Sequence, residues 1–519
     1  MLKFDHIFNF GTILELHFLS LNNIIGMKKI IFIFLVLISL ASSAQQKLEF
    51  KIDGLKDTTV FLARYFGDRL YYADTASSKN GSVIFNTKNF VGGVYAVVCP
   101  GSNYFELVVD NEDVLMETNI NDLSGKMVVK KSENNKLFYN YIKFLGTKKL
   151  EASSFKGDKD KMKQIDIEVK EYQRNKLFNN LDLFAAKVLA MSVDRPLPED
   201  VRGNDTLRYH FILKHYWENI DVTDNRIIHS PVYHKKLENF FRMIPQHPDT
   251  ICQYAHKLIS QMDETSKLFK YTVNHITYKY ETSNIMGMDA VFVCMAQQYY
   301  CPEAKTKAFW LDSTKLTEVC EKAKKTEPLL VGKPAPRIIL ADTTQENWID
   351  FYNLDNKYNL LMFWDPDCGH CKKEIPKLLN LYHELKEKNV DIEFIGFGTN
   401  LENDKWRKFI SDKELDWINL SDFRDANENP TKYLFEKKVT DLKSLNFRKT
   451  YDIFSTPQVY LVDKEKKILG KRLDAITLSK MLQHMEGIEI EYLKTLEELQ
   501  KKEKEKKEKA KKEKEMIDK

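Results

Sequence analysis

The sequence has 519 residues, of which 43% are hydrophobic and 30% are charged, and its formal net charge is +4. A chain of this length is too long for one ordinary hydrophobic core, so we expect several domains. Residues 501–519 hold 10 lysines against 6 acidic residues and account for the whole positive excess. The rest of the chain is near neutral, which argues against a nucleic-acid-binding protein.

A secretion signal is predicted at residues 27–44. Met27 is followed by two lysines, then by an apolar stretch at 30–40 and by small residues up to Ala44, which is the order of regions in a signal peptide. The apolar stretch is shorter than the roughly 20 residues that span a bilayer, although a membrane anchor is the alternative interpretation. We therefore expect residues 1–26 to be an upstream extension. The mature protein should be exported to the periplasm or cell envelope, without a membrane span after cleavage.

Residues 45–131 have the pattern of a β-rich domain. Runs of β-branched and aromatic residues occur at 58–63 and 104–109, and Asn80-Gly81 is a strong signal for a hairpin turn. A small β-sandwich is therefore expected. This domain contains no set of residues typical of a catalytic site. A cluster of aromatic residues in it belongs either to the hydrophobic core or to a surface that binds a partner. These residues are Tyr65, Phe66, Tyr71 and Tyr72.

Residues 132–326 have helical periodicity instead, with apolar side chains repeating every three or four positions, as at 237–244 and 269–280. We expect an all-α domain here. Several histidines fall in this region, and the spacings of five of them do not match paired metal ligands, so we predict no metal site and no cofactor. These five are His229, His234, His247, His256 and His275. We expect both upstream domains to be docking or dimerisation modules.

Two of the seven cysteines form a Cys-x-x-Cys pair at 368 and 371, and the other five are an odd number. At least one of the five should therefore stay unpaired within the chain. We favour buried, unpaired thiols over structural disulfides, and the spacings fit no metal template. The five are Cys99, Cys252, Cys294, Cys301 and Cys320, and Cys294–Cys301 is the first pair to test as a disulfide.

Residues 327–490 have the pattern of an α/β domain. A hinge with proline and glycine at 328–336 leads to a short hairpin and then to a buried strand at 358–364. After this strand we expect a helix, a second strand and a second helix. This order implies that the strands are parallel and joined by right-handed crossovers. A second hairpin and a closing helix complete the domain. The Lys/Glu-rich tail, 491–519, is expected to be a solvated helix or a disordered segment.

The chemistry is expected at Cys368 and Cys371, where the buried strand gives way to a helix. Unpaired backbone N–H groups and the helix dipole favour an anion there, and such Cys-x-x-Cys thiols have pKa values of roughly 3.5–7.5 instead of about 8.5. Cys368 would be the exposed nucleophile, and Cys371 the buried thiol that resolves the mixed disulfide. Gly369 and His370 lie between them and tune the reduction potential, whereas Asp367 acts against ionisation of Cys368.

The strand ending in Phe363-Trp364, followed by Cys-Gly-His-Cys-Lys, resembles the active site of the thioredoxin superfamily. Pro376 matches the proline that kinks the first helix of that superfamily, and residues 372–376 are similar to its exported TlpA/ResA-like branch. The resemblance implies a thioredoxin-like fold for this domain. It also implies that Glu374 assists proton transfer at the buried cysteine.

The resemblance extends to a loop far along the chain. Ser455-Thr456-Pro457 matches the cis-proline loop that faces the cysteines in the superfamily. By this resemblance, the backbone of Thr456 pairs with an extended substrate peptide beside Pro457, and Trp364 is taken as a further substrate contact. The order of a β-rich, a helical and a thioredoxin-like domain also resembles a multidomain exported type.

Two features depart from the thioredoxin pattern. Met362 stands where thioredoxin has a buried aspartate, six residues before the first cysteine, which leaves Glu374 as the candidate for proton transfer. The connection at 427–446 is longer than usual, so we expect altered substrate access.

Other uses of the cysteine pair fit less well. A zinc site would need a second Cys-x-x-Cys, and covalent haem would need a histidine at the position of Lys372. A peroxiredoxin would need proline and threonine where Leu361 and Asp365 stand. We therefore predict an exported thiol-disulfide oxidoreductase, a reductase or general exchanger that acts on protein or peptide disulfides. It would receive electrons from a thiol protein. The alternative is an exported binding module in which the pair is a structural disulfide.

Overall fold

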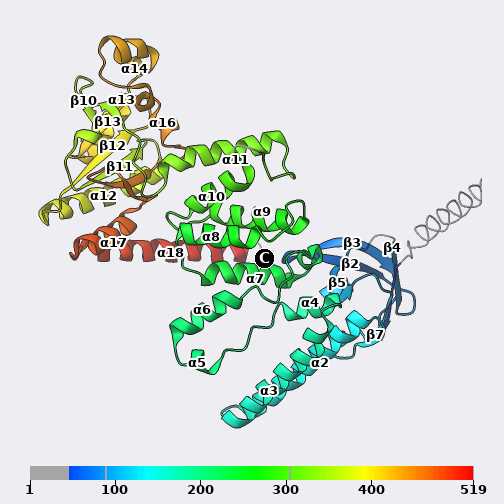
Figure 1. The fold of residues 1–519 in the computed structure, drawn as a ribbon. Helices are drawn as coiled ribbons and strands as arrows, with labels where there is room; N and C mark the ends of the chain where they lie inside the picture. The colour runs from blue at the N-terminus through cyan, green and yellow to red at the C-terminus, as the bar shows by residue number, and fades with distance from the viewer. Residues whose placement is uncertain (1–45, 88–89, 303–304, 518–519) are drawn as a thin grey trace, which may run out of the picture. The chain divides into compact units, whose positions relative to one another are not determined.

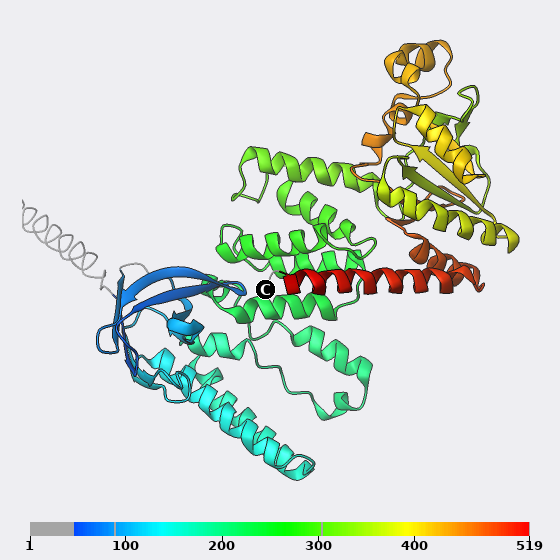
Figure 2. The same ribbon diagram turned by 180° about the vertical axis from the view of Figure 1, so that it is seen from behind.

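The computed structural model describes residues 46–87, 90–302 and 305–517. The predicted signal peptide at 27–44 lies outside these ranges. The chain divides into two compact units, one ending at Met243 and the other beginning at Ile244, and Figures 1 and 2 show their elements from opposite sides. No helix within the described ranges is both long and apolar enough to cross a membrane.

The first unit contains the predicted β-sandwich. One sheet has the strand order β4-β1-β7-β8 and the other β3-β2-β5-β6. Phe50 of the first sheet meets Phe105 of the second edge to face, with 5.4 Å between ring centroids, so apolar side chains fill the space between the sheets. The strands are β1 (Gln46–Asp53), β2 (Thr59–Phe66), β3 (Arg69–Ser77), β4 (Ser82–Thr87), β5 (Gly93–Val98), β6 (Tyr104–Val109), β7 (Val114–Asn119) and β8 (Val128–Lys131).

The turn predicted at Asn80-Gly81 is present and is closed by an antiparallel bridge between Lys79 and Ser82, but its two arms do not continue as a pair of strands. Both residues have positive φ, 49° and 75°, and a Cβ on Gly81 would lie 2.5 Å from the carbonyl oxygen of Ile52. The turn therefore requires glycine at this position. It joins β3 to β4, which belong to different sheets. The sequence signal identified the turn but could not say with which strands its two arms would pair.

The predicted aromatic cluster is divided between core and surface. Tyr65 is buried and donates a hydrogen bond to Glu106, with an O···O distance of 2.6 Å. Tyr71 and Tyr72 on β3 are 51% and 69% exposed. Tyr65 thus belongs to the core, and a partner surface at Tyr71 and Tyr72 stays a prediction.

Helices follow the sandwich in the same unit. The first two helices pack against each other as a helical hairpin. Phe144 of the first helix stacks on Tyr172 of the second, with 4.0 Å between ring centroids. The helices are α2 (Glu133–Ser154), α3 (Lys159–Lys176), α4 (Phe184–Ala190), α5 (Glu199–Arg202), α6 (Asp205–His215), the 3₁₀ helix η3 (Asn225–His229) and α7 (Pro231–Met243).

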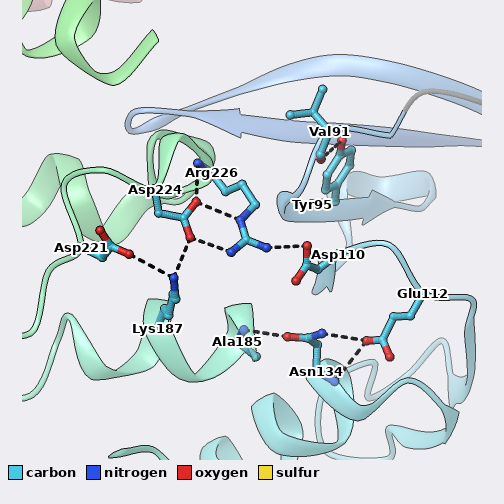
Figure 3. A network of polar contacts seen from close by, with 10 residues as sticks. All are labelled: Val91, Tyr95, Asp110, Glu112, Asn134, Ala185, Lys187, Asp221, Asp224 and Arg226. Atoms are coloured by element: carbon cyan, nitrogen blue, oxygen red, sulfur yellow. Dashed lines mark hydrogen bonds and ion pairs between the residues drawn. The ribbon is translucent and has the colours of Figure 1, made fainter. Parts of the chain in front are cut away.

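A polar network ties these helices to the sandwich (Figure 3). Arg226 of η3 donates to Asp110, which follows β6, at 2.6 Å, and also to Asp224. Lys187 of α4 contacts Asp224 at 3.1 Å. Asp224 is mostly buried, which acts to raise its pKa, but hydrogen bonds from Arg226 and Lys187 outweigh burial and lower it to about 2.

The second unit begins with the remaining helices of the predicted helical region, 132–326. The unit border at 243/244 therefore falls inside that region. Aromatic and aliphatic side chains bury one face of each main helix, among them Phe269 and Phe292. The helices are α8 (Pro248–Ile259), α9 (Lys267–Glu281), α10 (Asp289–Met295), the π-helical turn η4 (Ala296–Tyr300) and α11 (Ser313–Thr326).

Four of the five additional cysteines form disulfides, contrary to our expectation. The bonds join Cys252 to Cys294 and Cys301 to Cys320. Cys294 cannot reach Cys301 because the two residues lie on a nearly continuous helical stretch, where seven residues span about 10 Å. The predicted odd thiol is confirmed: Cys99 is free and buried, and burial raises its pKa to about 11.

The C-terminal region has the predicted α/β fold, and its seven-stranded sheet has the order β10-β9-β13-β12-β11-β14-β15. Central β11 pairs in parallel with β12 and antiparallel with β14. Short helices occupy the long connection between β13 and β14. The strands are β9 (Ile339–Ala341), β10 (Trp348–Asp350), β11 (Tyr358–Trp364), β12 (Ile392–Gly398), β13 (Ile418–Ser421), β14 (Gln458–Asp463) and β15 (Ile468–Lys471).

Helices cover the sheet on both faces. Met362 and Trp364 of β11 contribute to a core that includes residues of the long helices, whereas Leu361 and Phe363 point to the opposite core. The tail is a helix whose first turns are packed, since Leu493 and Leu496 are buried in the core of Met362. The helices are α12 (Gly369–Glu387), α13 (Asn403–Lys413), α14 (Arg424–Glu428), the π-helical turn η7 (Lys432–Glu436), α15 (Leu442–Leu445), α16 (Phe447–Thr450), α17 (Ala475–Glu486) and α18 (Tyr492–Ile517).

Candidate active site

The two cysteines of the Cys-x-x-Cys pair lie at the N-terminus of α12. All seven residues of β11 are buried, and after a short turn Cys368 is the N-cap residue of the helix. Cys368 is partly exposed, and Cys371, one turn into the helix, is fully buried. Both thiols are free. This arrangement matches the predicted division into an accessible and an inner sulfur.

Strand pairing brings the proline loop to the cysteines. Phe363 near the end of β11 lies opposite Gln458 at the start of antiparallel β14, so the residues that precede Gln458 face the start of α12. The Thr456–Pro457 bond is cis, and the Cys368 thiol donates a hydrogen bond to the Thr456 carbonyl oxygen at 3.1 Å. Two segments 88 residues apart in sequence thus meet at one sulfur atom.

The pKa of Cys368 lies below its ordinary value. Partial burial acts to raise it, whereas hydrogen bonding with the side chains of Thr456 and Cys371 and with the backbone N–H groups of Cys371 and His370 lowers it, and the lowering prevails. These N–H groups belong to the first turn of α12, where they have no partner within the helix. The helix start therefore stabilises the thiolate of Cys368.

The pKa of Cys371 is shifted in the opposite direction. Burial is the largest cause and raises it to about 12, and the neighbouring Cys368 adds to the increase. At neutral pH Cys371 is therefore a thiol, which cannot attack a disulfide until a base removes its proton. At the same pH, Cys368 is therefore more readily ionised than Cys371.

The charge of Asp367 is compensated by a neighbouring lysine. The backbone N–H of Asp367 donates to the Asp365 carboxylate at 2.7 Å, which closes the turn before Cys368. The Asp367 carboxylate forms an ion pair with Lys405 of α13, at 3.0 Å. The sequence identified Asp367 as unfavourable to a thiolate, but it could not indicate this counter-charge.

Glu374 lies one turn beyond Cys371 on α12, and its side chain is 16% exposed. Its carboxylate accepts a hydrogen bond from the backbone N–H of Ala475 at 2.7 Å and lies 3.4 Å from the Lys377 ammonium. Among the described residues, its hydrogen bonds do not include Cys371. The proton-transfer role expected for Glu374 stays a prediction.

Three other predicted site residues, Trp364, Gly369 and His370, differ in their exposure to solvent. Trp364, expected to contact the substrate, is completely buried and packs against Phe409 with 5.1 Å between ring centroids. Trp364 is therefore a core residue beneath the turn that carries Cys368, and the expectation that it contacts the substrate is wrong. His370 is exposed, and a Cβ on Gly369 would meet nothing within 4 Å. The segment between the cysteines is thus open to solvent.

A cleft of about 900 Å³ lies beside the cysteines. Its walls come from the start of α12, from the cis-proline loop, from the end of β15 and from α18. The sequence missed the contributions of β15 and α18, because the residues involved belong to no motif. Basic side chains outnumber acidic ones among the ionised lining residues, which are Lys373, Glu374, Lys377, Arg472, Asp474, Glu503, Lys506 and Lys507.

The cysteine site contains no cluster suited to a metal ion. Within the described ranges, the one group of three potential metal ligands is Cys252, His256 and Cys294, on α8 and α10.

Comparison with known proteins gives two family matches. Residues 331–470 match the AhpC/TSA family, and residues 160–326 match a domain of unknown function, DUF5106. The C-terminal region is a thioredoxin-like thiol-disulfide oxidoreductase domain. Leu361 and Asp365 of this region stand where a peroxiredoxin would have proline and threonine.

Two curated relatives and one solved structure are similar to parts of this chain. The thiol-disulfide oxidoreductase ResA of Bacillus cereus is 25% identical over 162 residues, which make up 31% of this chain and 80% of the relative. ResA of Bacillus subtilis is 35% identical over 72 residues, or 14% of this chain and 40% of the relative. A solved domain of a possible thiol-disulfide isomerase from Cytophaga hutchinsonii is 34% identical, covers 31% of this chain and 95% of its own, and has a TM-score of 0.25.

Proposed function

We propose that this chain catalyses thiol-disulfide exchange on protein or peptide disulfides through Cys368 and Cys371. The opposite pKa shifts of these two thiols carry the proposal: one is activated at the helix start, and the other is held protonated in the core. A structural disulfide needs no such difference. The partial exposure of Cys368 also favours attack on a substrate in solution.

The exchange takes place in two steps. The Cys368 thiolate attacks one sulfur of the substrate disulfide; a mixed disulfide forms, the substrate S–S bond breaks, and the departing sulfur takes up a proton from solvent. Cys371 then loses its proton and attacks the sulfur of Cys368. The second substrate sulfur leaves as a thiol and Cys368–Cys371 becomes a disulfide. The substrate gains two electrons, and a dithiol protein must return them to the enzyme.

Groups around the thiols have separate roles in these steps. Glu374 is our candidate for the base that accepts the proton of Cys371, because it lies one turn away on the same helix. The backbone of Thr456 is free to pair with an extended substrate once its carbonyl releases Cys368. Pro457 lines the cleft beside it. His370 lies between the two cysteines in the sequence and is our candidate for tuning the reduction potential.

We further propose that the protein works outside the cytoplasm, in the periplasm or cell envelope. The two disulfides, Cys252–Cys294 and Cys301–Cys320, support an oxidising compartment. The signal-peptide pattern at 27–44 supports the same location. A reductase or general exchanger should have a reduction potential of roughly −180 to −270 mV, whereas a value near −120 mV would indicate a dedicated oxidase.

Trapping of substrates tests the exchange mechanism. In the Cys371→Ser variant the first step proceeds but the second does not, so covalent complexes should accumulate and dissolve on addition of dithiothreitol. The matched control is the double variant Cys368→Ser/Cys371→Ser, which should trap nothing. Equal trapping by both variants would contradict the proposal.

A further inference from the structure

A second group of reactive side chains lies outside the cysteine site, in the helices that precede the thioredoxin-like domain. Cys252 and His256 are four residues apart on α8 and therefore lie on one face of the helix. Cys294 reaches them from α10. One ligand atom from each of the three residues lies within 4.8 Å of the other two.

The His256 ring is held with one nitrogen toward sulfur. Its Nε2 atom lies 3.2 Å from the Cys294 sulfur, and its Nδ1 atom lies 3.0 Å from the hydroxyl of buried Tyr299. A neutral ring that donates its Nδ1 proton to Tyr299 directs the lone pair of Nε2 at the sulfur. Metal-binding histidines are oriented in this way, by a partner on the nitrogen that does not bind the metal.

We propose that Cys252, His256 and Cys294 form a redox-gated site for a thiophilic cation, which is closed by the Cys252–Cys294 disulfide and binds Zn²⁺ when that disulfide is reduced. In the structure the two sulfurs are joined by a covalent bond and carry no negative charge, so neither is the thiolate that binds a thiophilic cation. A dithiol reductant opens the site: its two thiols become a disulfide, the Cys252–Cys294 bond breaks, and each cysteine gains a proton.

Binding of Zn²⁺ then displaces these two protons, so that two thiolates and the Nε2 atom of His256 surround the cation. The charges of the thiolates and of Zn²⁺ cancel, which suits a site between packed helices. Thiolate and imidazole ligands select Zn²⁺ over Mg²⁺ or Ca²⁺. Three protein ligands leave a fourth position for water or for an external thiolate.

The other disulfide offers a control within the same chain. Cys301 and Cys320 also form a bond near α11, but among the described residues no third ligand joins them. Reduction of this pair should therefore not create a comparable site.

The test uses the full chain in a Cys368→Ser/Cys371→Ser background, so that the thiols of the exchange site cannot bind metal. The protein is reduced with dithiothreitol, desalted under anaerobic conditions and titrated with Zn²⁺ or with Co²⁺. We expect one Zn²⁺ per chain and sulfur-to-cobalt charge-transfer absorption in the reduced protein, and neither in the oxidised protein. Equal binding in both states would overturn the proposal.

Further substitutions identify the ligands. Cys252→Ser/Cys294→Ser should abolish binding, whereas Cys301→Ser/Cys320→Ser should leave it unchanged. His256→Gln should weaken it by more than about 100-fold, and Tyr299→Phe by roughly 10- to 100-fold, the range for loss of an orienting partner. Retention of full affinity by His256→Gln would overturn the three-ligand assignment.

Alkylation provides a measurement that does not depend on how the variants fold. Zn²⁺ should protect Cys252 and Cys294 of the reduced protein against iodoacetamide, as mapped by mass spectrometry, while Cys301 and Cys320 react at an unchanged rate. Uniform protection of all four cysteines, or protection of none, would overturn the proposal.

Discussion

The network around Arg226 and the site around Cys368 use ionisable groups in opposite ways. Arg226 contacts Asp110 and Asp224, and Asp224 also contacts Lys187, so each of these charges has a counter-charge. At the cysteine site, the Cys368 thiol donates a hydrogen bond to a neutral carbonyl, and the Cys371 thiol is fully buried. Paired charges hold segments together, whereas a thiolate stabilised by backbone N–H groups and neutral side chains remains available for reaction.

The largest effect should follow from removal of the activated sulfur. Cys368→Ser should reduce insulin-disulfide turnover to the uncatalysed rate, because serine is not ionised and cannot form the mixed disulfide. The assay is insulin reduction with dithiothreitol as electron donor. Cys99→Ser is the matched control, since Cys99 is a buried thiol of the first unit. Turnover that survives in Cys368→Ser would assign the chemistry elsewhere.

In the first unit, loss of a central charge should affect stability and leave exchange activity unchanged. Arg226→Met leaves Asp110 and Asp224 without their main partner, and we expect a loss of about 3 kcal/mol in the free energy of unfolding. Amide hydrogen exchange in β6 and α4, followed as a function of denaturant concentration, measures the free energy of unfolding of the first unit.

An exposed ion pair provides the control for that substitution. Arg195 and Glu218 contact each other with side chains 51% and 42% exposed, so Arg195→Met should cost less than about 1 kcal/mol. If both substitutions cost the same, the network would not be the stabilising feature that we infer.

Glu374→Gln should slow the second step of exchange by about 100-fold, the lower part of the range for general base catalysis. The amide can still accept the hydrogen bond from Ala475, so the fold should be retained. Stopped-flow release of substrate from the mixed disulfide measures this step. The matched control is Glu384→Gln on the same helix, whose carboxylate accepts from Glu491 and Tyr492. If Glu374→Gln released substrate at the wild-type rate, Glu374 would not be the base, and solvent would accept the proton of Cys371.

Acid should weaken the network over a defined pH range. The pKa of Asp224 in the folded protein is about 2, below its ordinary value of 3.8. A lowered pKa means that the carboxylate stabilises the fold above about pH 4, and that this contribution of about 2 kcal/mol is lost as the pH falls from 4 toward 2. The stability difference between wild type and Asp224→Asn should therefore shrink over this range. A constant difference would contradict the assigned pKa.

The features that sequence predicted well are local. The buried strand ending at Trp364 and the helix start at Cys368 follow from neighbouring residues, the Thr456-Pro457 turn follows from the family resemblance of a short motif, and the structure contains all three. The β-rich, helical and α/β order of the chain follows from periodicity in the same way.

Features that depend on distant contacts were missed. The disulfide partners of Cys252 and Cys301 depend on how helices fold back on one another. Burial of Trp364 depends on α13, which supplies Phe409, and the counter-charge of Asp367 comes from Lys405 of the same helix. A sequence pattern specifies which face of an element is apolar, but not which element covers it.

Titration of the two thiols tests the central claim most directly. Alkylation rates of Cys368 and Cys371, followed separately by mass spectrometry from pH 4 to pH 12, report the pKa of each sulfur in the reduced full chain. We predict that Cys368 ionises below the ordinary value of a cysteine, and that Cys371 ionises only near pH 12. A single shared transition near the ordinary value of about 8.5 would contradict the account.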